Sequence, residues 1–185
     1  MALWDQNQYQ RAWNFASRIH QGQTLPAIDI PYINHLGLVA MEAMAAVAHY
    51  ANTESAIAQP NILVLCALLH DAIEDTPTTY DEVLAEFGVD IANGVLALTK
   101  DKKRGDKPAQ MQDSLQRIKQ QPKEVWMVKM CDRITNLQPP PAHWDKVKAA
   151  AYQQEAQLIL DALGEASEFL AARLAAKINQ YNDYL

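Results

Sequence analysis

The chain places three carboxylates and an imidazole directly after its most apolar segment. The stretch LLHDAIEDT, residues 68–76, contains His70, Asp71, Glu74 and Asp75. On a helix, residues three and four positions apart share a face, so these side chains would be crowded together. Like charges at this spacing raise one another's pKa and destabilise the helix unless a cation compensates them. A divalent metal ion is the strongest such cation, and histidine with aspartate is a mixed ligand pair suited to Mn, Fe or Zn.

Two further side chains are candidates to complete a metal site. His35 stands at the head of another apolar helix, and Asp132 lies inside the apolar segment VWMVKMCDRITNL. Two of the four residues also have a simpler interpretation. His70 could be a buried histidine satisfied by the adjacent acid, and Asp132 could form a surface ion pair with Lys129 or Arg133. The joint occurrence of the four residues favours the metal site.

Helices must position these residues, because apolar residues recur three to four positions apart and glycine is scarce, at 6 of 185 residues. The segment 60–73 is apolar on all sides and is expected at the buried centre. The pattern TYDE, with Thr79 and Glu82, has the form of a capping box. The spacing predicts helices at about 5–20, 32–50, 60–73, 79–88, 90–99, 107–120, 122–136, 145–162 and 165–184. The predicted fold class is all-α.

The composition indicates one globular domain over residues 1–185, with 49% hydrophobic and 21% charged residues. A formal net charge of -6 argues against a nucleic-acid binder, which would present a basic face. No uninterrupted apolar run of about 18 residues is present, and Asp5 and Arg11 come too early for a signal peptide. We therefore expect a cytoplasmic protein that does not enter a membrane. Cys66 and Cys131 sit in apolar runs as free thiols.

One segment is locally cationic although the chain as a whole is acidic. Residues 100–107, KDKKRGDK, contain four lysines and an arginine, with Lys102 near the middle. The segment is either a solvated loop or a rim that attracts phosphate beside a site.

The motifs taken together resemble a known family. His35, the His70-Asp71 dipeptide and Asp132 match the H…HD…D pattern of the HD-domain metal-dependent phosphohydrolases. The segments PYINH, ALLHDAIEDT, FG, LTK and KMCDRITNL occur in this order and are similar to the hydrolase domain of RelA/SpoT-type enzymes, in particular to the single-domain small alarmone hydrolases. The resemblance covers about residues 5–140. It implies an HD-domain bundle of about eight to ten helices around a central buried helix.

The resemblance also implies roles for individual residues. Glu74 and Asp75 match an acid pair assigned to water activation and substrate positioning. Asn136 matches an asparagine that contacts the nucleotide, although it is also placed to end its helix as a C-cap. The family's metal, usually Mn²⁺, would be held by His35, His70, Asp71 and Asp132. Four protein ligands on an ion that prefers six leave room for a water and a phosphate oxygen.

The activity implied by the resemblance is removal of the 3′-pyrophosphate from guanosine tetra- or pentaphosphate. Relatives usually carry an arginine that packs on guanine, in a stretch like H-x-G-Q-x-R after the first helix. Here the stretch is HQGQTLPAIDIPYINH, with no arginine or lysine between Arg18 and His35. This departure weakens guanine recognition and leaves another nucleotide open, such as an adenosine alarmone or NADPH. Arg18 and Lys102 are the basic side chains that could reach the base from elsewhere.

Two alternatives remain at this stage. The chain could be a non-catalytic HD module that senses a nucleotide, although such a module has no reason to keep the crowded acids Glu74 and Asp75. The helices of residues 145–185 could complete the core or form a homodimer surface through Leu158, Leu163, Leu170 and Leu174.

Overall fold

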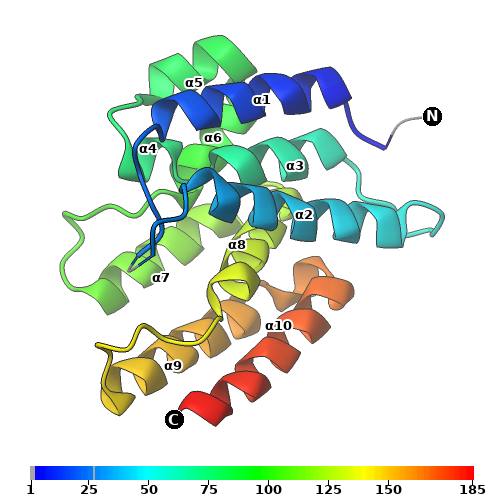
Figure 1. Ribbon diagram of the computed structural model, residues 1–185. Coiled ribbons are helices and arrows are strands. Elements are labelled where there is room, and N and C mark those ends of the chain that lie inside the picture. The colour runs from blue at the N-terminus through cyan, green and yellow to red at the C-terminus, as the bar shows by residue number, and fades with distance from the viewer. Residues whose placement is uncertain (1–2, 27) are drawn as a thin grey trace.

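The computed structural model describes residues 3–26 and 28–185, and the regular elements in these residues are helices (Figure 1). They are α1 (Gln6–Ile19), α2 (Ile33–Tyr50), α3 (Pro60–Leu69), α4 (Ala72–Asp75), α5 (Tyr80–Phe87), α6 (Val89–Leu98), α7 (Lys107–Lys119), α8 (Lys123–Asn136), α9 (Lys146–Leu163), the 3-10 turn η1 (Gly164–Ala166), α10 (Glu168–Gln180) and the 3-10 turn η2 (Tyr181–Tyr184). The prediction of an all-α fold is confirmed.

The helix α3 forms the centre of the core, as its uniformly apolar sequence predicted. All side chains from Ile62 to Leu69 are buried, and α1, α2, α6 and α8 pack around them. Such a helix cannot face water on any side, because every face would expose apolar surface. The residues that follow its carboxyl end, His70 and Asp71, therefore lie in the middle of the protein.

The predicted helix over residues 60–73 is wrong at its carboxyl end. The α3 helix ends at Leu69, and the short helix α4 begins only at Ala72. His70 provides the reason, because its Nδ1 atom lies 2.9 Å from the carbonyl oxygen of Ala67. In a continuing helix that carbonyl would accept the backbone N–H of Asp71. Because of this break, the side chains of Asp71, Glu74 and Asp75 point in other directions than they would on the continuous helix predicted from the sequence.

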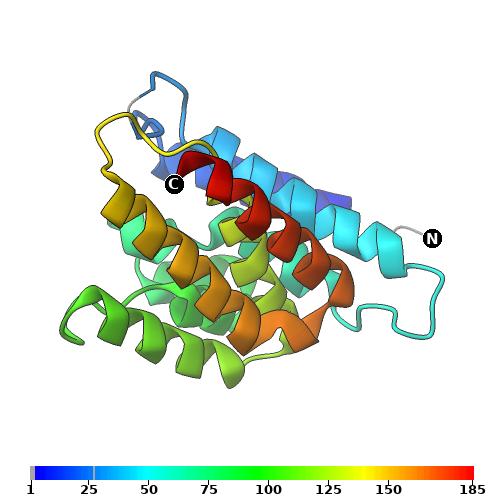
Figure 2. The ribbon, with the colours of Figure 1, turned by 90° about the horizontal axis from the view of Figure 1, so that it is seen from below.

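The chain returns to the core in α9 and α10, which lie side by side across α8 (Figure 2). Leu163, Leu170 and Leu174 are fully buried there, so these three leucines complete the core, whereas Leu158 is 41% exposed. An ion pair between the buried Glu42 and the exposed Arg173 links α2 to α10. Arg173 donates from Nε to Glu42 Oε2 at 2.5 Å and from Nη2 to Oε1 at 2.6 Å.

Two local predictions are confirmed. Thr79 and Glu82 form the reciprocal capping box at the start of α5. Cys66 and Cys131 are free and buried. In the described part of the chain, no helix combines the length and the apolarity that crossing a membrane requires.

Gly94 lies where α6 passes closest to α3 and α8. An added Cβ atom would lie 2.8 Å from Cys66 Sγ and 3.1 Å from Val125 Cγ2, and both neighbours are fully buried. We expect Gly94→Ala to lower the free energy of unfolding by about 1–3 kcal/mol through overpacking, although alanine favours helix. Thermal unfolding should show this as a fall of about 2–4 °C per kcal/mol.

The matched control for Gly94 is Gly164→Ala. An added Cβ at Gly164 would lie 3.4 Å and 3.6 Å from its nearest neighbours, which are ordinary contact distances. Its stability should therefore stay near that of the wild type. A Gly94→Ala protein as stable as this control would contradict the close approach of the three helices.

Candidate metal centre and active site

Four side chains from three separate segments converge at the carboxyl end of α3. His35 lies in the first turn of α2, His70 and Asp71 follow α3, and Asp132 lies in α8. Asp71 Oδ2 is 3.0 Å from His70 Nε2 and 3.8 Å from His35 Nε2. Asp132 Oδ1 is 3.7 Å and 3.5 Å from the same two nitrogens. The four predicted metal ligands are thus brought together.

The hydrogen bonding of His70 fits a metal ligand. Its Nδ1 can donate to the Ala67 carbonyl, which leaves a lone pair on Nε2. That Nε2 atom is buried and has no hydrogen-bond partner among the described residues, in spite of the nearby Asp71 oxygen. A buried histidine satisfied by its neighbouring acid does not account for this atom. His35, His70 and Asp71 each place one potential ligand atom within 4.8 Å of the others.

The electrostatics of the cluster favour a cation at its centre. Burial lowers the pKa of His70, but the charges of Asp71 and Asp132 outweigh burial and raise this pKa well above its ordinary value, so a metal ion would displace a proton from Nε2 on binding. Burial raises the pKa of Asp71, yet His70 reverses the effect and lowers it to about 2. The pKa of Asp132 is likewise raised by burial but lowered more strongly by Lys129 and the two imidazoles. Both aspartates are therefore ionised, as metal ligation requires.

Both carboxylates are held by further side chains that the sequence reasoning missed or interpreted differently. Tyr32 donates its hydroxyl to Asp71 Oδ2 at 2.5 Å. Lys129 donates to Asp132 Oδ2 at 3.0 Å, and the pair is buried rather than on the surface. Helical spacing was a usable signal for both, because Tyr32 precedes His35 by three residues and Lys129 precedes Asp132 by three.

Glu74 and Asp75 lie in α4 and have different surroundings. Glu74 is half-buried, and its Oε2 accepts a hydrogen bond from the backbone N–H of Lys100 at 2.8 Å. Asp75 is exposed, and its backbone carbonyl accepts from Gln23 Nε2 at 2.8 Å. Burial and the charge of Asp71 raise the pKa of Asp75, while Lys102 opposes them. Lys102 therefore lies within electrostatic reach of the acid pair.

The remaining predicted substrate contacts fall in different places. Asn136 donates from Nδ2 to Asp132 Oδ1 at 2.6 Å, so it belongs to the cluster. It is the last residue of α8, and Leu137 occupies the C-cap. Arg18 is not brought to the cluster. Its guanidinium lies 5.3 Å from the centroid of the Phe15 ring, on a helix face that packs toward α5.

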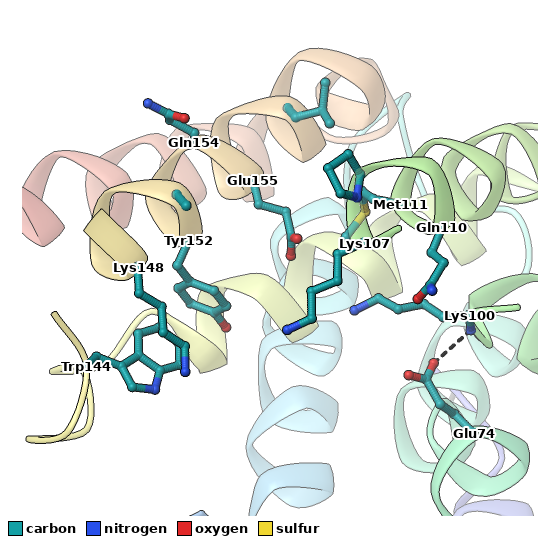
Figure 3. Close-up of a pocket in the computed structure, with 13 residues that line it drawn as sticks. Glu74, Lys100, Lys107, Gln110, Met111, Trp144, Lys148, Tyr152, Gln154 and Glu155 are labelled. Atoms are coloured by element: carbon teal, nitrogen blue, oxygen red, sulfur yellow. Dashed lines mark hydrogen bonds between the residues drawn. The ribbon is translucent and has the colours of Figure 1, made fainter. Parts of the chain in front are cut away.

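A cavity of about 850 Å³ opens between α4, α7 and α9 (Figure 3). Its wall includes Glu74, the lysines Lys100, Lys107 and Lys148, and the aromatic residues Trp144 and Tyr152. Figure 3 shows the amino groups of Lys100 and Lys107 directed into this space. Lysines and aromatic rings in one cavity of this size suit an anionic, ring-containing ligand.

The cavity adjoins the metal cluster through α8. Arg133, the residue after Asp132, is 3% exposed and places its guanidinium 4.3 Å from the centroid of the Tyr152 ring. It also pairs with Glu155, another residue of the cavity wall. Sequence reasoning missed Trp144, Lys148 and Tyr152, because no motif marks them. The sequence left open whether the segment 100–107 is a solvated loop or a rim that attracts phosphate. In the structure, Lys100 and Lys107 lie on the rim of this cavity.

The sequence model of the HD-domain family matches residues 12–168 of this chain. The chain belongs to the HD-domain family. The chain is 33% identical over 172 residues to guanosine-3′,5′-bis(diphosphate) 3′-pyrophosphohydrolase MESH1 from Xenopus tropicalis, with 88% of each chain covered. The Mus musculus protein of the same name is 30% identical over 161 residues, covering 82% of each chain.

The fold is shared more widely than the sequence. A solved structure of a metazoan ortholog of SpoT, which hydrolyzes ppGpp, matches with a TM-score of 0.78 at 22% identity and covers 98% of each chain. The bifunctional (p)ppGpp synthase/hydrolase SpoT of Escherichia coli K12 is 33% identical over 132 residues, which are 69% of this chain and 17% of that protein.

These comparisons confirm the expected family and the HD-domain helical bundle. They also support the expected enzyme class, a metal-dependent phosphohydrolase. The match to the HD-domain family ends at residue 168, whereas the resemblance carried by the motifs ends at about residue 140. That residues 1–185 form one domain stays a prediction.

Proposed function

We propose that this protein removes the 3′-pyrophosphate from guanosine 3′,5′-bis(diphosphate), with Mn²⁺ held by His35, His70, Asp71 and Asp132. The observation that carries the proposal is the convergence of these four side chains beside a cavity lined by lysines and aromatic rings. The names of the relatives from Xenopus tropicalis and Mus musculus support the same reaction.

The proposed mechanism divides the work between the cluster and the cavity wall. When bound, a divalent ion lowers the pKa of water and neutralises charge on the phosphate. Glu74, oriented by the Lys100 backbone N–H, accepts one proton of the water that attacks the phosphorus next to the ribose 3′-oxygen. The P–O bond to the 3′-oxygen breaks, pyrophosphate is released, and Glu74 returns the proton to the 3′-oxygen as the 3′-hydroxyl forms. Asp75 positions the substrate beside it. Lys129 and Asn136 hold the Asp132 carboxylate still while the proton moves.

The nucleotide is proposed to occupy the cavity of Figure 3. Its phosphates contact Lys100, Lys107 and Lys148, and its base packs between aromatic rings of the wall. Lys102 contacts a phosphate near Asp75. Asn136 bonds Asp132 through Nδ2, and its side-chain oxygen Oδ1 contacts the nucleotide. We propose no substrate role for Arg18, because its guanidinium lies against Phe15.

The test is a substrate panel assayed with the full-length protein and Mn²⁺. We expect release of pyrophosphate from guanosine 3′,5′-bis(diphosphate) with the highest kcat/KM of the panel, which also contains the adenosine analogue and NADPH. Nucleotide binding without turnover of any compound, in protein with metal bound, would contradict the proposal and favour the non-catalytic sensing module.

A different nucleotide is the second candidate substrate. The observation that favours it is the segment 21–34, which contains neither arginine nor lysine and so offers no guanidinium to a guanine base. A higher kcat/KM for the adenosine compound or for NADPH would establish this candidate in place of the first. The metal chemistry would be the same.

The setting of the reaction is part of the proposal. We propose a cytoplasmic enzyme that acts on a small nucleotide and binds no nucleic acid, in keeping with its formal net charge of -6. A homodimer formed through the helices of residues 145–185 stays a prediction. Because Leu163, Leu170 and Leu174 are buried, such a surface would use other side chains, such as Leu158.

Lys148→Ala is expected to weaken nucleotide binding without changing the chemical step. Lys148 lines the cavity, and its Nζ lies 4.4 Å from the centroid of the Trp144 ring. Loss of one charged phosphate contact should raise KM about tenfold, with kcat nearly unchanged. Lys146→Ala in the same turn of α9 is the matched control, because Lys146 is exposed and outside the cavity wall. Equal KM values for the two variants would remove the phosphate role of Lys148.

A further inference from the structure

The segment that joins α1 to α2 is tied to the acids of the candidate active site at two points. Tyr32 donates its hydroxyl to Asp71 Oδ2 at 2.5 Å. Gln23 donates from Nε2 to the backbone carbonyl of Asp75 at 2.8 Å. Neither residue lines the cavity assigned to the nucleotide. These two contacts therefore reach the cluster from outside that cavity.

The position of the Tyr32 ring is fixed within this segment. The ring stacks on His20 with centroids 5.2 Å apart and an interplanar angle of 30°. His20 is 3% exposed, and its Nδ1 lies 2.7 Å from Gln23 Oε1. The backbone N–H of Tyr32 donates to the Gln23 carbonyl at 2.9 Å, and an antiparallel bridge joins Thr24 to Pro31. The phenol ring is thus held by packing on His20, and the Tyr32 backbone is held by its hydrogen bond to Gln23.

The hydroxyl of Tyr32 acts on the one Asp71 oxygen that faces both imidazoles. Asp71 Oδ2 lies 3.0 Å from His70 Nε2 and 3.8 Å from His35 Nε2. The Asp71 side chain is 17% exposed, so it has room to rotate toward solvent if nothing holds it.

We propose that Tyr32 is a positioning residue that holds the Asp71 carboxylate in the orientation that binds metal. The segment 20–32 then sets the affinity for the metal, while the cavity between α4, α7 and α9 sets the affinity for the nucleotide. The inference rests on the proposed function in one respect, because it takes Asp71 as a metal ligand. It adds a residue outside the ligand set and assigns that residue an effect on metal affinity alone.

The test is a calorimetric titration of metal-free, full-length protein with Mn²⁺. Tyr32→Phe removes only the hydroxyl, and we expect the Kd for Mn²⁺ to rise about 10–100-fold, the usual effect of losing an outer partner of a metal ligand. Tyr80→Phe is the matched control. Its hydroxyl donates to Asn93 Oδ1 at 2.9 Å between α5 and α6, so its Kd should equal that of the wild type.

A second readout separates positioning from general damage to the fold. With Mn²⁺ at saturating concentration, Tyr32→Phe should keep the wild-type KM for the nucleotide, because the cavity wall is unchanged. An unchanged or smaller Kd for Mn²⁺, or a raised KM at saturating metal, would overturn the proposal. Wild-type protein that binds Mn²⁺ but hydrolyses no nucleotide would overturn the proposed function alone. Wild-type protein that binds no Mn²⁺ would overturn both.

Discussion

Replacement of Asp71 by alanine is expected to abolish Mn²⁺ binding. Asp71 supplies an oxygen, Oδ2, that faces both imidazole Nε2 atoms, at 3.0 Å from His70 and 3.8 Å from His35. Loss of an outer partner of a ligand already weakens metal binding by about 10–100-fold. Loss of the ligand itself should exceed this range, since the two histidines and Asp132 would remain as an incomplete set.

The measurement is metal analysis of the purified Asp71→Ala protein together with a Mn²⁺ titration. Asp75→Asn is the matched control, because Asp75 is four residues away in the chain, exposed and outside the cluster, and it should bind Mn²⁺ like the wild type. An Asp71→Ala protein loaded fully with metal would remove the ligand assignment and, with it, the mechanism proposed for hydrolysis.

Replacement of Glu74 by glutamine should have the opposite profile, with metal retained and turnover lost. Glutamine keeps an oxygen that can accept the Lys100 backbone N–H, so the side chain should stay in place. It cannot accept a proton from water, so we expect kcat to fall about 10²–10⁴-fold, the usual contribution of general base catalysis. The Kd for Mn²⁺ should remain that of the wild type.

The control for this variant is Glu124→Gln. Glu124 is buried and accepts the backbone N–H of Gln59 at 2.9 Å, so it resembles Glu74 in bonding but lies at the amino end of α8. Its kcat should be unchanged. Wild-type kcat in Glu74→Gln would move the role of general base to another carboxylate, and the same substitution at Asp75 would then identify it.

Much of the fold and of the metal cluster could be predicted from the sequence, because both depend on strong local patterns. Apolar spacing marked the helices, and the apolar run before His70 marked the buried centre. His35 and Asp132 could be joined to the His70-Asp71 dipeptide because each stands in an apolar helix, where an ionisable side chain needs a partner.

The parts that escaped prediction depend on packing between distant segments. The end of α3 at Leu69 follows from a side-chain bond that His70 makes to the helix backbone, which apolar spacing does not reveal. The cavity is built from residues of α4, α7 and α9. Its wall is linked to the cluster by the buried Arg133, which follows Asp132 in α8 and contacts the Tyr152 ring. Such placements are decided by tertiary structure, so no sequence pattern marked Lys148 or Tyr152.

The ion pair between Glu42 and Arg173 has a consequence for how the protein is made. Glu42 is 4% exposed and lies two turns along α2 from His35. During vectorial synthesis on the ribosome, α2 emerges long before α10, so burial of the Glu42 carboxylate has no counter-charge until Arg173 has been translated. We therefore expect α2, which carries one of the four candidate ligands, to reach its final packing late, and the nascent chain to acquire its affinity for metal late.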